Sequence, residues 1–132
     1  MNFDRLVEIS KALKGKQQTG RAFHTTFAMR NGKIFSIGIN RYNKTHPMTR
    51  NYISRFGNQH SYTSGIHSES DCIAKLKMDD CSEFDFINIR IMNTGDLGLS
   101  RSCPNCFGLH QQFGFKRLFY SNGLGGFSRI IH

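Results

Sequence analysis

The feature that most constrains the fold is an Asn31-Gly32 pair between two apolar runs. Asn-Gly is favoured in the two-residue turn that joins antiparallel strands, because both residues tolerate a positive φ. The segments on either side, Phe23 to Met29 and Lys33 to Asn40, are therefore predicted to be the two strands of a β-hairpin. The chain is expected to contain a sheet that begins with this antiparallel pair.

Helical and strand patterns alternate around the hairpin. Apolar residues spaced three and four apart predict a helix over Phe3 to Leu13, and residues 41–65 form a long polar segment. The elements predicted after that segment are a helix over Ile66–Met78, a strand over Phe84–Met92, a loop over Asn93–Arg101, a helix over Cys103–Phe113 stopped by Gly114, a strand over Arg117–Ser121 and a short strand over Phe127–Ile131. This order predicts an α/β fold with a mixed central sheet of about five strands flanked by helices.

Length and charge narrow the class of protein. The 132 residues, 38% of them hydrophobic, suffice for a single domain over residues 1–132 with a buried core. No apolar run approaches the roughly 20 residues that span a bilayer, and residues 1–14 lack the apolar centre of a signal peptide, so we expect a soluble, cytoplasmic protein without a membrane partner. The net charge of +9 favours anionic partners such as nucleotides or nucleic acid, although it also suits a protein that is simply kept soluble by its charge.

Two short motifs carry candidate chemistry: His-Ser-Glu at residues 67–69 and Cys-Pro-Asn-Cys at residues 103–106. Each falls at the predicted start of a helix that follows a loop. If the two helices are neighbours, one imidazole and two thiolates converge, and such a set of three protein ligands leaves the fourth tetrahedral position of a zinc ion open to water. Glu69 would lie beside that position as a general base and acid.

The cysteines also allow other interpretations. A Cys-x-x-Cys pair serves structural zinc sites and redox centres, and four cysteines could form two disulfides. A structural zinc site needs a fourth protein ligand, and the candidates Cys72 and His110 are awkwardly placed a further turn along the predicted helices. Without a secretory signal, and with a Cys-x-x-Cys pair present, metal or redox chemistry is favoured over disulfides. We interpret Cys72 and Cys81 as a buried thiol and a loop thiol.

His-x-Glu followed by Cys-x-x-Cys resembles the signature of the zinc-dependent cytidine and deoxycytidylate deaminase superfamily. The resemblance continues through Gly-Ile-Asn at residues 38–40, Lys-Thr-His-Pro at 44–47 and Tyr-Ser at 120–121, and so covers most of the chain after the first helix. It implies a three-layer cytidine-deaminase-like fold, a bound Zn2+ and hydrolytic deamination of a cytosine nucleotide, with dCMP as the favoured substrate. A small-molecule nucleotide partner and assembly as a homo-oligomer are implied in the same way.

The resemblance also implies roles for individual residues. The metal ligands and the proton-transfer residue would be His67, Cys103, Cys106 and Glu69. Asn40 would contact the sugar, the backbone of Ser68 the pyrimidine carbonyl, and the backbone carbonyl of Ser102 the amino group under attack. Ser102 replaces the proline usual in the family and Ser68 replaces an alanine, and the first change puts the rigidity of the loop in question.

The choice of substrate depends on weaker signals. Lys44 and Arg50 are candidate phosphate contacts, although basic side chains on a loop are ordinarily just exposed to solvent. Tyr120 is a candidate for stacking on the base, although such a ring more often packs against the core. The alternative function is deamination of cytosine or adenine in tRNA or single-stranded DNA, which the charge of +9 fits but the scattered basic residues do not. A non-enzymatic binding protein is a third class, and Glu69 argues against it.

Overall fold

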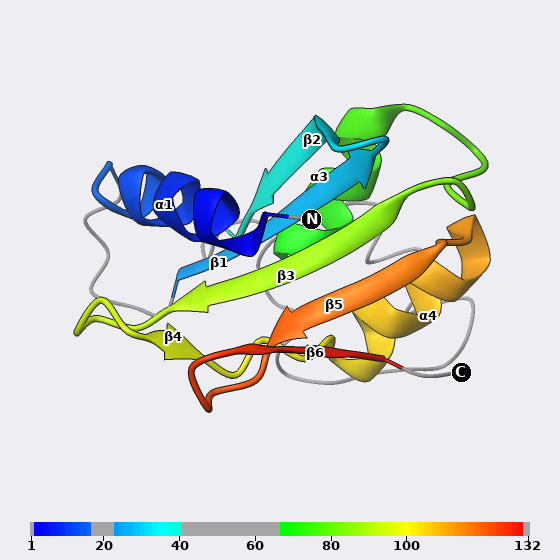
Figure 1. Ribbon diagram of the computed structural model, residues 1–132. Coiled ribbons are helices and arrows are strands. Elements are labelled where there is room, and N and C mark those ends of the chain that lie inside the picture. The colour runs from blue at the N-terminus through cyan, green and yellow to red at the C-terminus, as the bar shows by residue number, and fades with distance from the viewer. Residues whose placement is uncertain (1, 17–22, 41–66, 131–132) are drawn as a thin grey trace.

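The computed structural model of the chain describes residues 2–16, 23–40 and 67–130 (Figure 1). The described elements are α1 (Phe3–Lys14), β1 (Phe23–Arg30), β2 (Lys33–Ile39), α3 (Ser68–Leu76), β3 (Asp85–Ile91), β4 (Leu97–Gly98), α4 (Pro104–Phe113), β5 (Arg117–Ser121) and β6 (Phe127–Arg129). They form three layers, with α1 on one face of the sheet and α3 and α4 on the other (Figure 1). Within the described ranges no helix is both long and apolar enough to cross a membrane.

The sheet is mixed, as predicted. Its strand order is β2-β1-β3-β5-β6, and β4 pairs with β3. β3 and β5 run parallel, whereas the other pairs are antiparallel. β4 lies in the segment predicted as a loop, Asn93–Arg101, and brings the sheet to six strands, one more than expected. A strand of two residues carries no periodic signal, which is why the sequence does not reveal it.

The turn and most element boundaries agree with the predictions. Asn31 and Gly32 have φ of 53° and 75°, the two positive values that a type I′ turn requires. The helix predicted to reach Met78 instead ends at Leu76, because Lys77 adopts the left-handed conformation with φ of 55°. The last strand also ends earlier than predicted, at Arg129.

The cysteines outside the Cys-x-x-Cys motif are core residues. Cys72 on α3 and Cys81 in the loop before β3 are both fully buried in one hydrophobic cluster. The interpretation of Cys81 as a loop thiol was therefore correct for its position but missed its burial. All four cysteines are free, and burial raises the pKa of Cys72 to about 12. These two thiols serve the packing of the core.

The sheet face covered by α3 and α4 changes from apolar to polar along its length. Strand register places Ala28, Phe86 and Leu118 side by side, and all three belong to the hydrophobic cluster. The next row consists of Thr26, Asn88 and Tyr120, each two residues away from its counterpart along the strand. It lies on the same face, because side chains alternate between the two faces of a sheet. The polar half of this face lies beneath the candidate active site.

His110 on α4 is a buried histidine in an apolar environment. Its ring lies 4.7 Å from that of Phe86 between centroids, and within the described part of the chain neither ring nitrogen has a hydrogen-bond partner. Burial lowers the pKa of His110 to about 3. His110 therefore takes up a proton at a higher pH in the unfolded chain than in the folded chain. As a result, the free energy of unfolding decreases as the pH falls from about 6.5 toward 3.

We expect His110→Leu to raise the free energy of unfolding by about 1 kcal/mol at pH 7.5, because it removes a buried polar ring without partners. The difference in the free energy of unfolding between the variant and the wild type should grow below pH 6.5 by up to about 1.4 kcal/mol per pH unit, because leucine cannot bind a proton. Urea unfolding of both proteins at pH 7.5 and 5.5 measures this difference. An identical loss of stability with pH in the two proteins would show that His110 is not the group responsible.

Candidate active site

The two motifs come together at the N-termini of α3 and α4. His67 is the N-cap of α3 and Cys103 the N-cap of α4, and both have extended backbone, with φ and ψ of −84° and 149° and of −67° and 162°. Neither side chain forms a capping hydrogen bond with its own helix. Pro104 occupies the first turn of α4, where its fixed φ suits the start of a helix. The prediction that both motifs lie at helix starts is confirmed.

The spacing of the donor atoms suits a metal ion. Nδ1 of His67 and Sγ of Cys103 and Cys106 all lie within 4.8 Å of one another. His67 Nδ1 is 3.2 Å from Cys106 Sγ and 3.5 Å from Cys103 Sγ. Nitrogen and sulfur ligands of a tetrahedral zinc ion are separated by roughly 3.5 Å, given their bond lengths to the metal. The three side chains can therefore hold a metal ion.

A fourth protein ligand is not among the described residues near this group. Cys72 donates to the carbonyl oxygen of Ser36 at 3.7 Å, and His110 lies in the apolar core. Neither belongs to the metal-binding group. Among the described residues the group thus has three protein ligands, the number that catalytic zinc sites use, whereas structural zinc sites use four.

The two thiols of this group share a proton. Their hydrogen bond lowers the pKa of Cys103 to about 4, against the opposing effect of burial, with His67 contributing in the same direction. The same hydrogen bond, together with burial, raises the pKa of Cys106 well above its usual value. One thiolate is therefore ready at neutral pH, and metal binding would release the proton that remains.

Glu69 lies beside the cluster, in the first turn of α3. Burial raises the pKa of its carboxyl, as does the neighbouring Cys103, while His67 and a hydrogen bond from the Ser102 side chain lower it. Its carboxyl group also hydrogen-bonds with Cys106. A carboxyl group that could transfer protons thus lies next to the position where a metal would be bound, as its spacing from His67 predicts.

Gly38 on β2 allows α3 to sit directly on the sheet. A Cβ atom at this position would overlap the carbonyl oxygen of Ser68 and the amide nitrogen of Cys72, and would lie 2.8 Å from Cys72 Cβ. Hydrogen bonds also tie the helix to the same strand; in two of them, Ser36 Oγ donates to Cys72 O at 2.8 Å and Ile39 N donates to Asp71 Oδ2 at 3.0 Å. The absence of a side chain at residue 38 therefore sets the position of His67 and Glu69.

Solved structures of known enzymes have the same architecture. The chain is similar to the cytidine deaminase from Burkholderia pseudomallei, with a TM-score of 0.60 and 17% identity over 98% of this chain and 92% of that one. The chain has a cytidine deaminase-like fold. It is also similar to the apo dCMP deaminase from the cyanophage S-TIM5, with a TM-score of 0.53 and 16% identity over 90% and 81% of the two chains.

The cytidine deaminase-like fold confirms the fold that the resemblance implied. The sequence by itself matches no protein-family model and no curated protein. At identities of 16% and 17% the agreement lies in the fold. The roles of individual residues therefore stay predictions, which the geometry of this chain supports to different degrees.

The residues predicted to contact the substrate are placed as follows. Ser68 and Ser102 adjoin the metal-binding group. Asn40 is buried at the end of β2, where its Oδ1 accepts a hydrogen bond from the backbone N–H of His24 at 2.9 Å. Tyr120 is half-buried against the hydrophobic cluster, with the Arg101 guanidinium 6.0 Å from its ring centroid. Lys44 and Arg50 lie outside the described residues.

Sequence reasoning missed the polar residues beneath the site in this cytidine deaminase-like fold. His24 Nδ1 lies 3.1 Å from Ser100 Oγ, and burial, followed by the charge of Arg90, lowers the pKa of His24 to about 4. Thr26 and Asn88 are fully buried and hydrogen-bonded to each other. The signal that could have found Asn88 is a polar residue between the apolar Ile87 and Ile89 of its strand, whereas Thr26 follows two other polar residues and gives no such signal.

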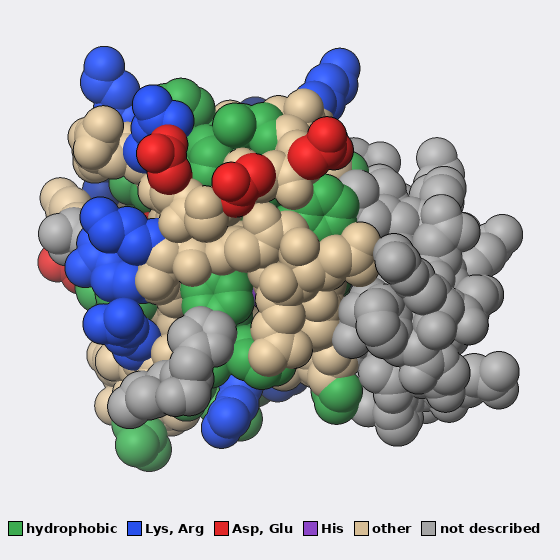
Figure 2. Space-filling view, turned by 90° about the vertical axis from the view of Figure 1, so that its right-hand side faces the viewer, with side chains coloured by type: hydrophobic (Ala, Val, Ile, Leu, Met, Phe, Trp, Pro, Cys, Tyr) green, Lys and Arg blue, Asp and Glu red, His purple; other side chains and the backbone are tan. Residues whose placement is uncertain are grey.

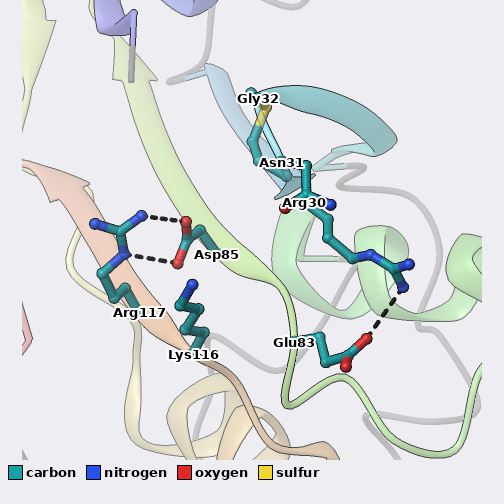
Figure 3. Close-up of a pocket in the computed structure, with 8 residues that line it drawn as sticks. Arg30, Asn31, Gly32, Glu83, Asp85, Lys116 and Arg117 are labelled. Carbon is teal, nitrogen blue, oxygen red and sulfur yellow. Dashed lines mark hydrogen bonds and ion pairs between the residues drawn. The ribbon is translucent and has the colours of Figure 1, made fainter.

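A cavity of about 200 Å³ lies at the other end of the sheet, where β1 ends and β3 and β5 begin. Its charged side chains pair with one another: Arg117 donates to Asp85 at 2.6 and 2.9 Å, and Arg30 Nη1 lies 3.1 Å from Glu83 Oε2 (Figure 3). None of the described residues predicted to bind metal or substrate lines it. The cavity is therefore separate from the candidate active site.

Proposed function

We propose that the protein is a zinc-dependent hydrolytic deaminase that converts a cytosine nucleotide, foremost dCMP, to the uracil nucleotide and releases ammonia. One observation carries this proposal: three metal-binding side chains, His67, Cys103 and Cys106, converge beside the buried carboxyl of Glu69. Three protein ligands suit a catalytic zinc ion better than a structural one. The cytidine deaminase-like fold supports the class of reaction.

The reaction consumes one water molecule and releases one molecule of ammonia. A zinc ion held by the three side chains would lower the pKa of water, which makes a nucleophile available near neutral pH. Glu69 accepts a proton from the attacking water and passes protons to the ring nitrogen and to the departing amine. Addition at carbon 4 forms the new C–O bond, and the C–N bond then breaks to give the uracil ring.

The substrate contacts are proposed in the same way. Asn40 contacts the sugar, the backbone of Ser68 binds the pyrimidine carbonyl and the backbone carbonyl of Ser102 accepts from the amino group. For the phosphate and the base we propose Lys44, Arg50 and Tyr120. The net charge of +9 is consistent with an anionic substrate. We also propose that the enzyme assembles as a homo-oligomer, which light scattering of the purified protein would test.

One face of the described residues favours a small nucleotide over a nucleic acid. On the face shown in Figure 2, Lys and Arg side chains stand in separate places along the rim, and Asp and Glu side chains lie among them. A protein that tracks a nucleic-acid backbone presents a continuous basic groove instead. A nucleic-acid substrate is therefore the alternative that the assay must test.

The assay incubates the zinc-loaded protein with cytidine, deoxycytidine, CMP, dCMP, dCTP and a cytosine-containing single-stranded oligonucleotide, and follows uracil products by chromatography. We expect dCMP to be converted fastest, and a chelator to abolish turnover until zinc is restored. Turnover of the oligonucleotide alone would assign the protein to the nucleic-acid deaminases. One bound zinc per chain without turnover of any of these compounds would contradict the proposal.

A further inference from the structure

Thr26 and Asn88 form a buried polar pair in the middle of the sheet. They face each other across β1 and β3, and both are fully buried. Burying a hydroxyl and an amide costs several kcal/mol unless each finds a hydrogen bond. The next row on the same face, Ala28 and Phe86, shows that an apolar pair fits between these strands and the helices. The fold alone therefore does not require polar groups here.

Both residues bond toward the candidate active site. Thr26 Oγ1 lies 2.8 Å from Ser68 Oγ, and it donates to Asn88 Oδ1 at 2.8 Å. Asn88 Nδ2 in turn donates to Ser102 Oγ at 3.0 Å. Ser68 follows the proposed metal ligand His67, and Ser102 precedes the proposed ligand Cys103. The pair thus connects the starts of α3 and α4, where the metal-binding side chains lie.

Counting protons fixes the direction of this chain of hydrogen bonds. The single hydroxyl proton of Thr26 goes to Asn88 Oδ1. The proton of Ser68 can go either to Thr26 Oγ1 at 2.8 Å or to Glu69 Oε1 at 3.4 Å. Ser102 accepts from Asn88, which leaves its own proton for another acceptor. The Ser102 side chain makes a hydrogen bond with Glu69 that favours the carboxylate. The chain therefore runs from Thr26 through Asn88 to Ser102 and ends on Glu69, and Ser68 joins it at Thr26.

Ser68 and Ser102 are the ends of this chain. An alanine at either position could not take part, because it has no side-chain hydroxyl. We propose that Thr26 and Asn88 are positioning residues, which hold the Ser102 hydroxyl on Glu69 and fix the loop before Cys103. The proposal rests on the proposed function only where it concerns turnover, because the placement of Cys103 also governs metal affinity.

The test compares two neighbouring threonines that are equally buried. Thr26→Val removes the hydroxyl that joins Ser68 to Asn88, whereas Thr25→Val removes a buried hydroxyl that has no partner among the described residues. Thr25 faces the opposite side of the sheet, because side chains alternate along a strand. Zinc affinity is measured by competition with a chromophoric chelator. The values of kcat and KM are measured by steady-state kinetics on the nucleotide that the wild type converts.

We expect Thr26→Val to lower zinc affinity or kcat by about 10- to 100-fold, as loss of groups that orient metal ligands does, with KM within about twofold. Thr26→Ser, which restores the hydroxyl, and Thr25→Val should both stay within about twofold of the wild type. Ser102→Ala should reproduce the loss, and its combination with Thr26→Val should add little, because both break one chain. If Thr26→Val does not fold, the half-buried Ser102→Ala decides the question.

Wild-type zinc affinity and kcat in both Thr26→Val and Ser102→Ala would overturn the proposal, as would an equal loss in Thr25→Val. The zinc measurement also separates the two proposals. If the zinc-loaded wild type converts no nucleotide, the proposed function fails. The ratio of zinc affinities of Thr26→Val and Thr25→Val then still decides whether the buried pair positions the ligands.

Discussion

Glu69→Gln should lower kcat by roughly 100- to 10,000-fold, the contribution typical of a general acid–base group. Glutamine keeps the size of the side chain and its ability to bond with Ser102, but its amide cannot accept and return protons at neutral pH. Zinc content should stay at one ion per chain, because His67, Cys103 and Cys106 are unchanged. The measurements are steady-state kinetics on the best nucleotide and metal analysis of both proteins.

Asp71→Asn is the matched control for this substitution. Asp71 is also a buried carboxylate in the first turn of α3, but it bonds to the backbone N–H of Ile39 and pairs with Lys75 at 2.8 Å. We expect its variant to keep kcat within about threefold while losing about 1 kcal/mol of stability, the scale of one such interaction. A kcat within tenfold of the wild type for Glu69→Gln would exclude Glu69 as the proton-transfer group.

Gly38→Ala should lower the free energy of unfolding by about 3 kcal/mol or more, the upper range for overpacking a core. The added methyl group meets the backbone of Ser68 and Cys72, which cannot move aside as a flexible side chain would. Relief requires α3 to shift away from β2, and that shift would move His67 and Glu69 relative to Cys103. We therefore expect zinc affinity to fall together with stability, which urea unfolding and chelator competition measure.

Gly15→Ala separates this effect from a general intolerance of alanine. Gly15 follows α1 with a helical φ of −59°, and a Cβ there would lie 3.4 Å from the carbonyl oxygen of Ala12, an ordinary contact. That variant should be unchanged or stabilised by about 0.5 kcal/mol, since alanine reduces the freedom of the unfolded chain. Gly38→Ala with wild-type stability would show that α3 is not seated on β2 as described.

Features that depend on neighbours in the chain were predictable from the sequence. The Asn31-Gly32 turn, the helix over α1 and the start of α4 at Cys103 rest on rules about residues within a few positions of one another. The donor set of the candidate site was predictable for the same reason, because each motif spans only three or four residues. Two local features were not predicted from the sequence: the two-residue strand β4 and the left-handed conformation of Lys77. Neither produces a recognisable sequence pattern.

Features that depend on the sheet were decided only by the tertiary structure. His67 and Cys103 are 36 residues apart in sequence, and Thr26 and Asn88 are 62 apart. Strand order and register bring each pair together, and neither can be read from a single strand. The amino-acid sequence thus determined which candidate metal-binding and proton-transfer groups this protein has. The folded chain decided that they meet, and that Thr26 and Asn88 lie beneath them, because contacts between distant segments follow from how the strands pair.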